Sequence, residues 1–202
     1  MTTKQILIAL FISSIFSLTS CDDMFDDRIE GDENVTIKTG DISSFDELIS
    51  EGKFEVFITK ADSTSLVLEA EENLQAFIIT EVHDHKLYIE EKDHYRLDNN
   101  KPMKIFVTTS NIDKITLTGS GNIDCDSIFA EYLDIEITGT GRIDLNNLMV
   151  EEINAEISGS GNIYVNATDY LIATITSSGD IYYEGNPDLN ENVTGTGDVR
   201  RY

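Results

Sequence analysis

Apolar and polar residues alternate along most of the second half of the chain. In four consecutive segments, mostly aliphatic side chains fall on every second position before and after a short polar turn. The pattern comprises Ile115, Leu117, Ile123 and Cys125; Ile135, Ile137, Ile143 and Leu145; Ala155, Ile157, Ile163 and Val165; and Ala173, Ile175, Ile181 and Tyr183. A period of two is typical of strands with one buried face. This half is therefore predicted to consist of short β-strands.

The polar turns repeat nearly the same sequence five times. They read TGSGNID at 118–124, TGTGRID at 138–144, SGSGNIY at 158–164, SSGDIY at 177–182 and TGTGDV at 194–199. The last glycines of the five turns, at 121, 141, 161, 179 and 197, are 20, 20, 18 and 18 residues apart. A fixed period of this length indicates a solenoid, in which each rung buries its apolar side by stacking on its neighbours. We predict an all-β solenoid with 18–20 residues per rung.

Glycine suits the corner of such a coil, because it tolerates a positive φ and allows a close approach between backbones. Stacked corners would align two outward polar columns. The first is a column of hydroxyls, Ser120, Thr140, Ser160, Ser178 and Thr196, and the second comprises Asn122, Arg142, Asn162, Asp180 and Asp198.

The first half of the chain lacks the glycine repeat but contains segments with the same strand pattern. These are KFEVFIT at 53–59, SLVLEAE at 65–71, HKLYIEE at 85–91 and MKIFVTT at 103–109. Helix signals are weak throughout. SFDELIS at 44–50 is predicted to form one or two helical turns that cap the stack, as a solenoid needs at its ends.

The N-terminus has the features of a secretory signal. Residues 1–20 carry one charge, Lys4, and an apolar stretch that is too short for a membrane span of about 20 residues. LTSC at 18–21 resembles a bacterial lipobox, so Cys21 is predicted to be lipidated and to anchor the chain in a membrane; the alternative is a secreted protein cut near Ser20. The acidic residues 21–35 are predicted to form a flexible tether, and residues 36–202 a single domain.

The chain is strongly acidic. Without residues 1–20 it has 13 basic and 38 acidic residues, which gives a formal charge of −25. Such a surface repels polyanions, so nucleic acid is not expected as a partner. Cations, basic proteins and neutral glycans stay open, as does a role of the charge in solubility alone. With Cys21 lipidated, Cys125 has no partner for a disulfide.

The order of these segments resembles a known family. SFDELISEGKFEVFITKADSTSLVLEAEENL, EVHDHKLYIEE and KIFVTTSNIDKITLTGSGNID, in this order, are similar to the head GIN domain family of adhesin-like proteins, common among lipoproteins of the Bacteroidetes, over about residues 36–202. The resemblance implies a single-stranded right-handed parallel β-helix and a role in adhesion. The acids after Cys21 also resemble the surface-export signals of such lipoproteins, so the outer membrane is expected, facing the cell surface or else the periplasm. The chain departs from the family pattern at Arg142 and Ser177.

The residues of the chain suggest three possible chemical roles. Polysaccharide lyases and hydrolases also use β-helices, but basic residues in the repeats are few, so no catalytic residue is assigned. Calcium could be held by acids of the repeats, although each rung has one glycine turn where calcium-binding repeats have two; these acids are Asp124, Asp126, Asp144, Asp180 and Asp198. His83 and His85 could form a metal pair on one strand, but solvated side chains are the simpler interpretation, and no metal or other cofactor is assigned.

Cys125 and two short serine motifs complete the set of candidate residues. Cys125 falls in the inward column and is interpreted as a core residue, since no activating base is identified. DST at 62–64 and DSI at 126–128 match a short O-glycosylation pattern, which makes Ser63 and Ser127 candidate modification sites.

The predicted function is that of a binding module without chemistry. Repeating strands would present an array of hydroxyl, amide and carboxylate groups to a glycan or a protein. The candidate binding face comprises Ser120, Asn122, Thr140, Ser160 and Asn162. A polysaccharide-active enzyme and a purely structural envelope component are the alternatives.

Overall fold

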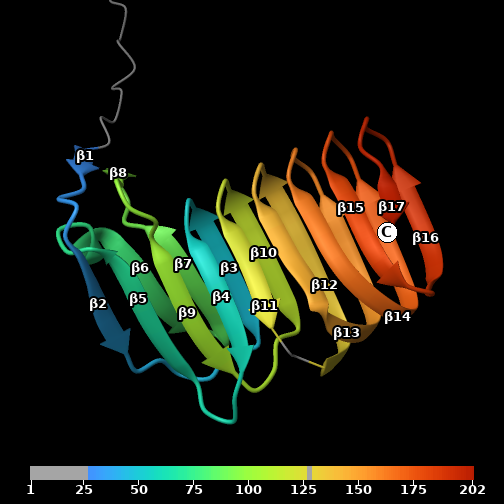
Figure 1. The fold of residues 1–202 in the computed structure, drawn as a ribbon, viewed down its shortest axis with the longest axis horizontal. Coiled ribbons are helices and arrows are strands. Elements are labelled where there is room, and N and C mark those ends of the chain that lie inside the picture. The colour runs from blue at the N-terminus through green and yellow to red at the C-terminus, as the bar shows by residue number, and fades with distance from the viewer. Residues whose placement is uncertain (1–26, 127–128) are drawn as a thin grey trace, which may run out of the picture.

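The computed structural model describes residues 27–126 and 129–202 (Figure 1). The predicted signal peptide, the predicted lipidation site Cys21 and the candidate modification site Ser127 lie outside the described residues. Within them, the chain forms strands and one short 3-10 helix, η1 (Gln75–Phe77), and contains no helix with the length and hydropathy of a membrane span. Fifteen strands form one large sheet, which curls over on itself. The all-β prediction is confirmed.

Two facing walls of stacked parallel strands contain the C-terminal half of the chain together with two strands from the first half. The front wall contains β4 (Glu55–Lys60), β11 (Asn122–Asp126), the first parts of β13 (Arg142–Ile157) and β14 (Asn162–Ile175), β15 (Asp180–Gly185) and β17 (Val199–Arg201). The back wall contains β3 (Glu47–Gly52), β10 (Lys114–Gly119), β12 (Phe129–Gly139), the second parts of β13 and β14, and β16 (Asp188–Val193).

The register of these strands follows the predicted period. Ile123 is paired with Ile143, which is paired with Ile163 one rung further, and the row continues to Ile181. On the back wall, Ile115 is paired with Ile135 in the same way. The repeat in the sequence therefore corresponds to parallel strands stacked in register.

The first half of the chain is a mixed sheet. Its remaining strands are β1 (Asp27–Glu30), β2 (Val35–Gly40), β5 (Ser65–Glu71), β6 (Ile78–His83), β7 (Lys86–Glu91), β8 (Tyr95–Asp98) and β9 (Lys104–Thr109). β2 with β5, β5 with β9 and β6 with β7 are antiparallel, whereas β3 with β7 and β4 with β9 are parallel. A parallel solenoid over the whole domain is therefore not what the chain forms.

The turn between β6 and β7 explains why these two strands are antiparallel. Asp84 and His85 both have positive φ, 49° and 64°, and they join the two strands as a tight hairpin, which forces antiparallel pairing. The predicted pair of His83 and His85 on one strand is therefore wrong. His83 ends β6 beside Glu81, and His85 lies in the turn.

The predicted helical turns at 44–50 are also wrong. This segment runs into β3, in which Leu48 is fully buried and lies between Leu87 of β7 and Ile115 of β10. Burying a leucine contributes about 1.5–3 kcal/mol, which exceeds the small differences in helix propensity along such a short segment.

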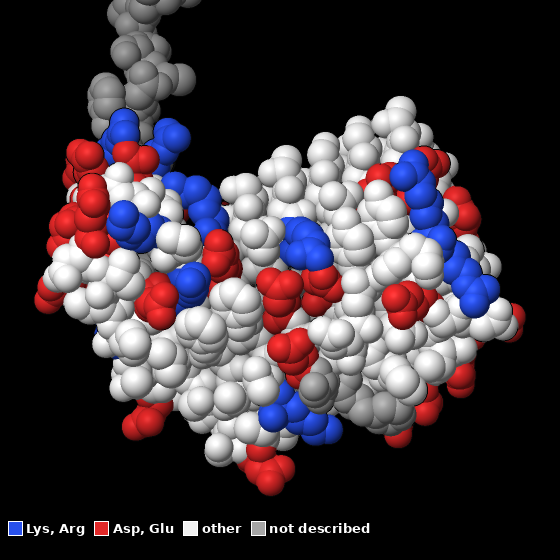
Figure 2. Space-filling model, in the orientation of Figure 1, with Lys and Arg blue, Asp and Glu red and all other residues white. Residues whose placement is uncertain are grey.

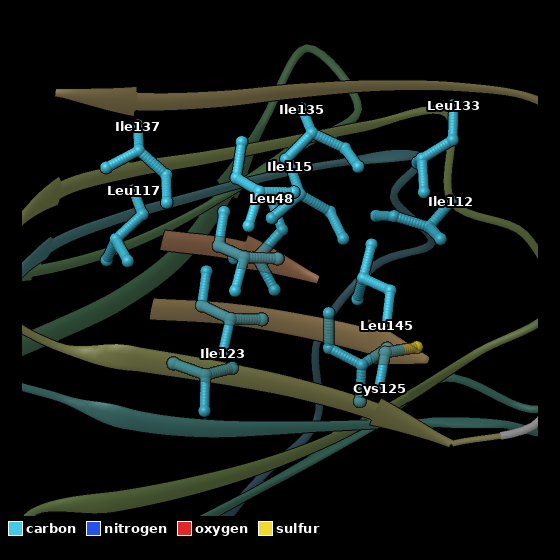
Figure 3. Close-up of a cluster of buried hydrophobic side chains, with 14 of the residues drawn as sticks. Leu48, Ile112, Ile115, Leu117, Ile123, Cys125, Leu133, Ile135, Ile137 and Leu145 are labelled. Atoms are coloured by element: carbon cyan, nitrogen blue, oxygen red, sulfur yellow. The ribbon is translucent and has the colours of Figure 1, made fainter. Parts of the chain in front are cut away.

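The apolar rows of the two walls face each other across the interior (Figure 3). Leu117, Ile115 and Ile135 from the back wall point toward Ile123 and Cys125 from the front wall. Burial raises the pKa of the Cys125 thiol to about 12, with a smaller contribution from Asp126. Cys125 is thus a neutral core group, as predicted, rather than a nucleophile.

The glycine corners join the two walls, and both predicted uses of glycine occur. Gly119 and Gly139 have positive φ, 120° and 151°. A Cβ on Gly141 would overlap the carbonyl oxygen of Gly121 in the rung before, and that oxygen accepts a hydrogen bond of 3.1 Å from the N–H of Arg142. Neighbouring rungs approach each other here more closely than any side chain allows.

The N-terminal segment is fixed to the body of the domain. β1 pairs with β8, so residues 27–30 are part of the folded domain although they lie in the range predicted as a tether. Nearby, the fully buried carboxylate of Glu71 accepts the backbone N–H groups of Glu33 at 2.7 Å, Asn100 at 2.8 Å and Lys101 at 3.2 Å. The buried Glu71 carboxylate thus connects the loop at Glu33 with the loop at Asn100 and Lys101.

At the other end of the stack, two of the inward positions carry charged residues, whereas Leu189, Val193 and Val199 continue the apolar rows. Glu191 of β16 follows Ala173 in an inward row of the back wall, and Arg201 of β17 follows Tyr183 on the front wall. Among the described residues, β16 and β17 have a strand partner on one side only.

Candidate functional site

The five predicted binding residues gather along one edge of the front wall. Ser120, Thr140 and Ser160 lie at the exposed glycine corners, and Asn122 and Asn162 are the first residues of β11 and β14. Arg142 lies between these two asparagines in the register. The structure thus brings together the residues that the repeat marked, and their role in binding stays a prediction.

Two positions further along each strand, a second row crosses the front wall, which we call the front row. It consists of Phe106, Phe57, Asp124, Asp144, Tyr164, Tyr182 and Arg200, each paired with the next. The row therefore presents an aromatic pair, an acidic pair and a second aromatic pair along the stack. Its side chains point outward, because they alternate with the buried row that contains Ile123 and Ile143.

The aromatic side chains of the front row stack on each other. The ring centroids of Phe57 and Phe106 are 5.0 Å apart, and those of Tyr164 and Tyr182 are 4.8 Å apart with an interplanar angle of 8°. Tyr202 stands edge-on to both tyrosines, at 6.3 Å and 6.2 Å. Such stacking fixes the rings in place, so the row offers a surface with little side-chain entropy to lose on binding.

Arg142, at which the chain departs from the family pattern, has several partners on the front wall. Its guanidinium pairs with Asp144 and lies 3.8 Å from Asp124, and its Cζ is 4.8 Å from the centre of the Tyr164 ring. Burial raises the pKa of Asp124, and the carboxylates of Asp144 and Asp126 add to this, while Arg142 opposes it. Arg142 thus relieves the repulsion between two stacked acids in a row where each rung adds a side chain about 4.8 Å away.

Arg200 repeats this arrangement at the C-terminal end of the front row. It pairs with Asp198 and lies 3.9 Å from Asp180, which also accepts a hydrogen bond of 3.0 Å from the hydroxyl of Tyr182. This hydrogen bond raises the pKa of Tyr182. Four of the five acids named as calcium candidates are thus engaged with arginine or tyrosine, and the fifth, Asp126, accepts a hydrogen bond of 3.1 Å from the Asn147 side chain. In the described ranges 27–126 and 129–202, no three His, Cys, Asp or Glu side chains are grouped as a metal site would require.

The candidate modification site that the structure describes lies away from the front row. Ser63 is exposed in the loop between β4 and β5, where its carbonyl accepts a hydrogen bond from the Thr108 hydroxyl, and it stays a prediction as a modification site.

The front row was not predicted from the sequence. Its signal was present, because Phe57 and Phe106 occupy equivalent places in EVFIT and KIFVT, and Tyr164 and Tyr182 both follow the isoleucine after the glycine turn.

Comparisons with known proteins agree on a family. The family model described as "Putative auto-transporter adhesin, head GIN domain" matches residues 44–146 and 129–187. A search of curated proteins found no match. Among solved structures, a "putative adhesin" from Bacteroides fragilis is similar, with a TM-score of 0.60 and 20% identity over 86% of this chain and 100% of that one.

A second "putative adhesin", from Parabacteroides merdae, has a TM-score of 0.52 and 18% identity over 87% of this chain and 99% of that one. At these identities the two structures show a shared fold. An adhesin-like family indicates a cell-surface or envelope protein. Since the family model spans well over half of its length, the chain belongs to the head GIN domain family.

Proposed function

We propose that this chain is a non-catalytic binding module of the cell envelope that presents its front wall to a glycan or a protein. The observation that carries the proposal is the front row, in which stacked rings and paired charges lie outward on a rigid set of parallel strands. Beside it, the hydroxyl and amide groups of the glycine-corner edge add donors and acceptors. The stacked rungs of residues 114–202 would form a right-handed parallel β-helix.

Many weak polar contacts suit a flat array of this kind. Backbone pairing in register fixes the spacing of its groups, so a ligand with a repeating structure could contact several rungs at once. Arg142 pairs with both carboxylates of the front row, Asp124 and Asp144, which supports recognition rather than proton transfer.

The binding proposal can be tested with a chain carrying Cys21→Ser, which cannot be lipidated, on an array of glycans and envelope or host proteins. Replacing Ser120, Asn122, Thr140, Ser160 and Asn162 together with alanine is expected to abolish binding to whatever ligand the parent chain captures. A control on the back wall replaces Thr116, Thr174 and Asn192 with alanine and should leave binding unchanged. Equal binding by both variants would contradict the assignment, and turnover of a glycan would favour the enzyme alternative.

We further propose that a lipid on Cys21 anchors the module in the outer membrane, with the domain facing the cell surface. The residues that support this are the lipobox-like LTSC and the acids that follow it. The protein recovered from a membrane fraction is expected to begin at Cys21 and to carry a diacylglycerol, as intact-mass measurement would reveal. The Cys21→Ser chain should leave the membrane fraction, and its retention there would argue against the anchor.

A further inference from the structure

A short side of the stack, opposite the glycine corners, joins the front wall to the back wall. It is formed by the middle portions of β13 and β14 and the start of β12, where Val150 and Ala167 point inward and are buried. Three large apolar side chains on or beside this side are exposed: Tyr132 by 48%, Met149 by 55% and Tyr170 by 39%. Exposed apolar groups gathered on one surface are characteristic of interaction sites.

Two of these side chains flank a carboxylate in register. Tyr132 of β12 is paired with Glu152 of β13, which is paired with Tyr170 of β14, and the row continues to Asp188 of β16. Since neighbouring strands are about 4.8 Å apart, the two tyrosines lie about 10 Å apart with Glu152 between them. A cation placed over Glu152 would lie within the roughly 6 Å of each ring at which a cation–π interaction is favourable. We call Tyr132, Glu152 and Tyr170 the clamp.

The charge around the clamp is negative and is not balanced by a basic side chain in the described part of the chain. Five carboxylates, those of Glu131, Glu151, Glu152, Asp169 and Asp188, lie on or beside this side, and none forms an ion pair with any described residue. No lysine or arginine occurs between residues 143 and 199. On the back wall, by contrast, Lys114 lies 3.1 Å from Asp134 and 3.5 Å from Glu136.

The front view agrees with this distribution, because acidic atoms are visible along the lower rim of the C-terminal half (Figure 2). Next to the clamp, Tyr132 also forms one wall of a hollow of about 520 Å³, whose other walls are Asn111, Asp113, Ala130 and Glu131. This hollow has room for one further side chain of a partner.

We propose that this side binds a basic segment of another protein, with a lysine or arginine side chain held in the clamp. The row of acids extends over several rungs, which fits a partner with several positive charges better than a single small cation. Met149 and the tyrosine rings provide apolar surface for the aliphatic stems of these side chains. The surface is separate from the front wall, so this inference does not depend on the front-wall proposal.

The test uses the Cys21→Ser chain and a short fluorescein-labelled peptide in which arginine and leucine alternate, at low ionic strength. Fluorescence anisotropy is expected to show binding that Glu152→Gln, and separately the double change Tyr132→Ser with Tyr170→Ser, weaken about tenfold. The matched control is Glu156→Gln, which removes the same charge from an exposed position of the same strand and should change the affinity less than about twofold.

Three outcomes would overturn the proposal. The first is equal weakening by Glu152→Gln and Glu156→Gln, which would mean that the peptide responds only to net charge. The second is the absence of peptide binding by a parent chain whose circular dichroism shows the folded state. The third is full displacement of the peptide by free choline, which would indicate a site for a small quaternary ammonium. A peptide with glutamate in place of arginine should not bind.

Discussion

Replacing Gly141 with alanine is expected to lower the free energy of unfolding by about 3 kcal/mol or more. The added Cβ would overlap the carbonyl oxygen of Gly121. That oxygen cannot move aside without lengthening its hydrogen bond to the N–H of Arg142, and the same contact recurs between Gly161 and Gly141 in the next rung. A backbone shift that relieved the overlap at Gly141 would therefore disturb the contact between Gly161 and Gly141 in the next rung.

Denaturant unfolding followed by circular dichroism measures this loss. The matched control is Gly40→Ala, at the end of β2, where a Cβ would meet no atom within 4 Å and φ is not positive. Its effect should be below about 0.5 kcal/mol. If the two alanine variants were equally stable, the close approach of the corners would not be what requires glycine there.

Replacing Glu71 with glutamine is expected to cost on the order of 3 kcal/mol. The side chain has the same shape, but its amide N–H₂ group would replace an oxygen that accepts hydrogen bonds from backbone N–H groups, and donors would then face donors in a buried site. The neighbouring Glu72→Gln is the control, since Glu72 is exposed and its carboxylate accepts a hydrogen bond of 2.8 Å from the Asn34 side chain. Urea unfolding at neutral pH compares the two.

The same site predicts a dependence on pH. Burial raises the pKa of Glu71, but hydrogen bonds from the backbone of Glu33, Lys101 and Asn100 and from the Asn100 side chain outweigh it, so the pKa falls below its ordinary value of 4.5. A lowered folded pKa means that the stabilisation is complete above the unfolded pKa and is lost as the pH falls through the folded pKa. The difference in stability between the parent and Glu71→Gln should therefore shrink as the pH drops below 4.5. A difference independent of pH would contradict an ionised Glu71.

How far the sequence predicts this fold depends on the repeat. Between residues 114 and 202 each rung carries its own glycine turn, so the turns align the rungs and the inward rows follow directly. The first half has no such marker. β2 pairs with β5 and β5 with β9, and nothing local in these segments distinguishes antiparallel from parallel partners. The hairpin at Asp84 and His85 depends on positive φ at both residues, which is uncommon for residues other than glycine and is not marked by a glycine in this segment.

In the candidate site too, the sequence predicts the register of the residues but not the contacts of their side chains. The alignment of Asn122, Arg142 and Asn162 was predictable from the period, whereas the partners of Arg142 depended on which way a long side chain turns between two rungs. Glu71 could not be identified from the sequence as a buried hydrogen-bond acceptor. The three backbone N–H groups that donate hydrogen bonds to its carboxylate belong to residues at least 29 positions away in sequence.

The charged residues at the end of the stack have a consequence for the behaviour of the protein in concentrated solution. A column of parallel strands with open backbone groups on its last rung is a template on which another copy could continue to grow, as in a fibril. Glu191 and Arg201 occupy the positions that such growth would have to dehydrate. A contact in which a second copy extended these two strands would therefore have to desolvate both charges, which disfavours that way of stacking.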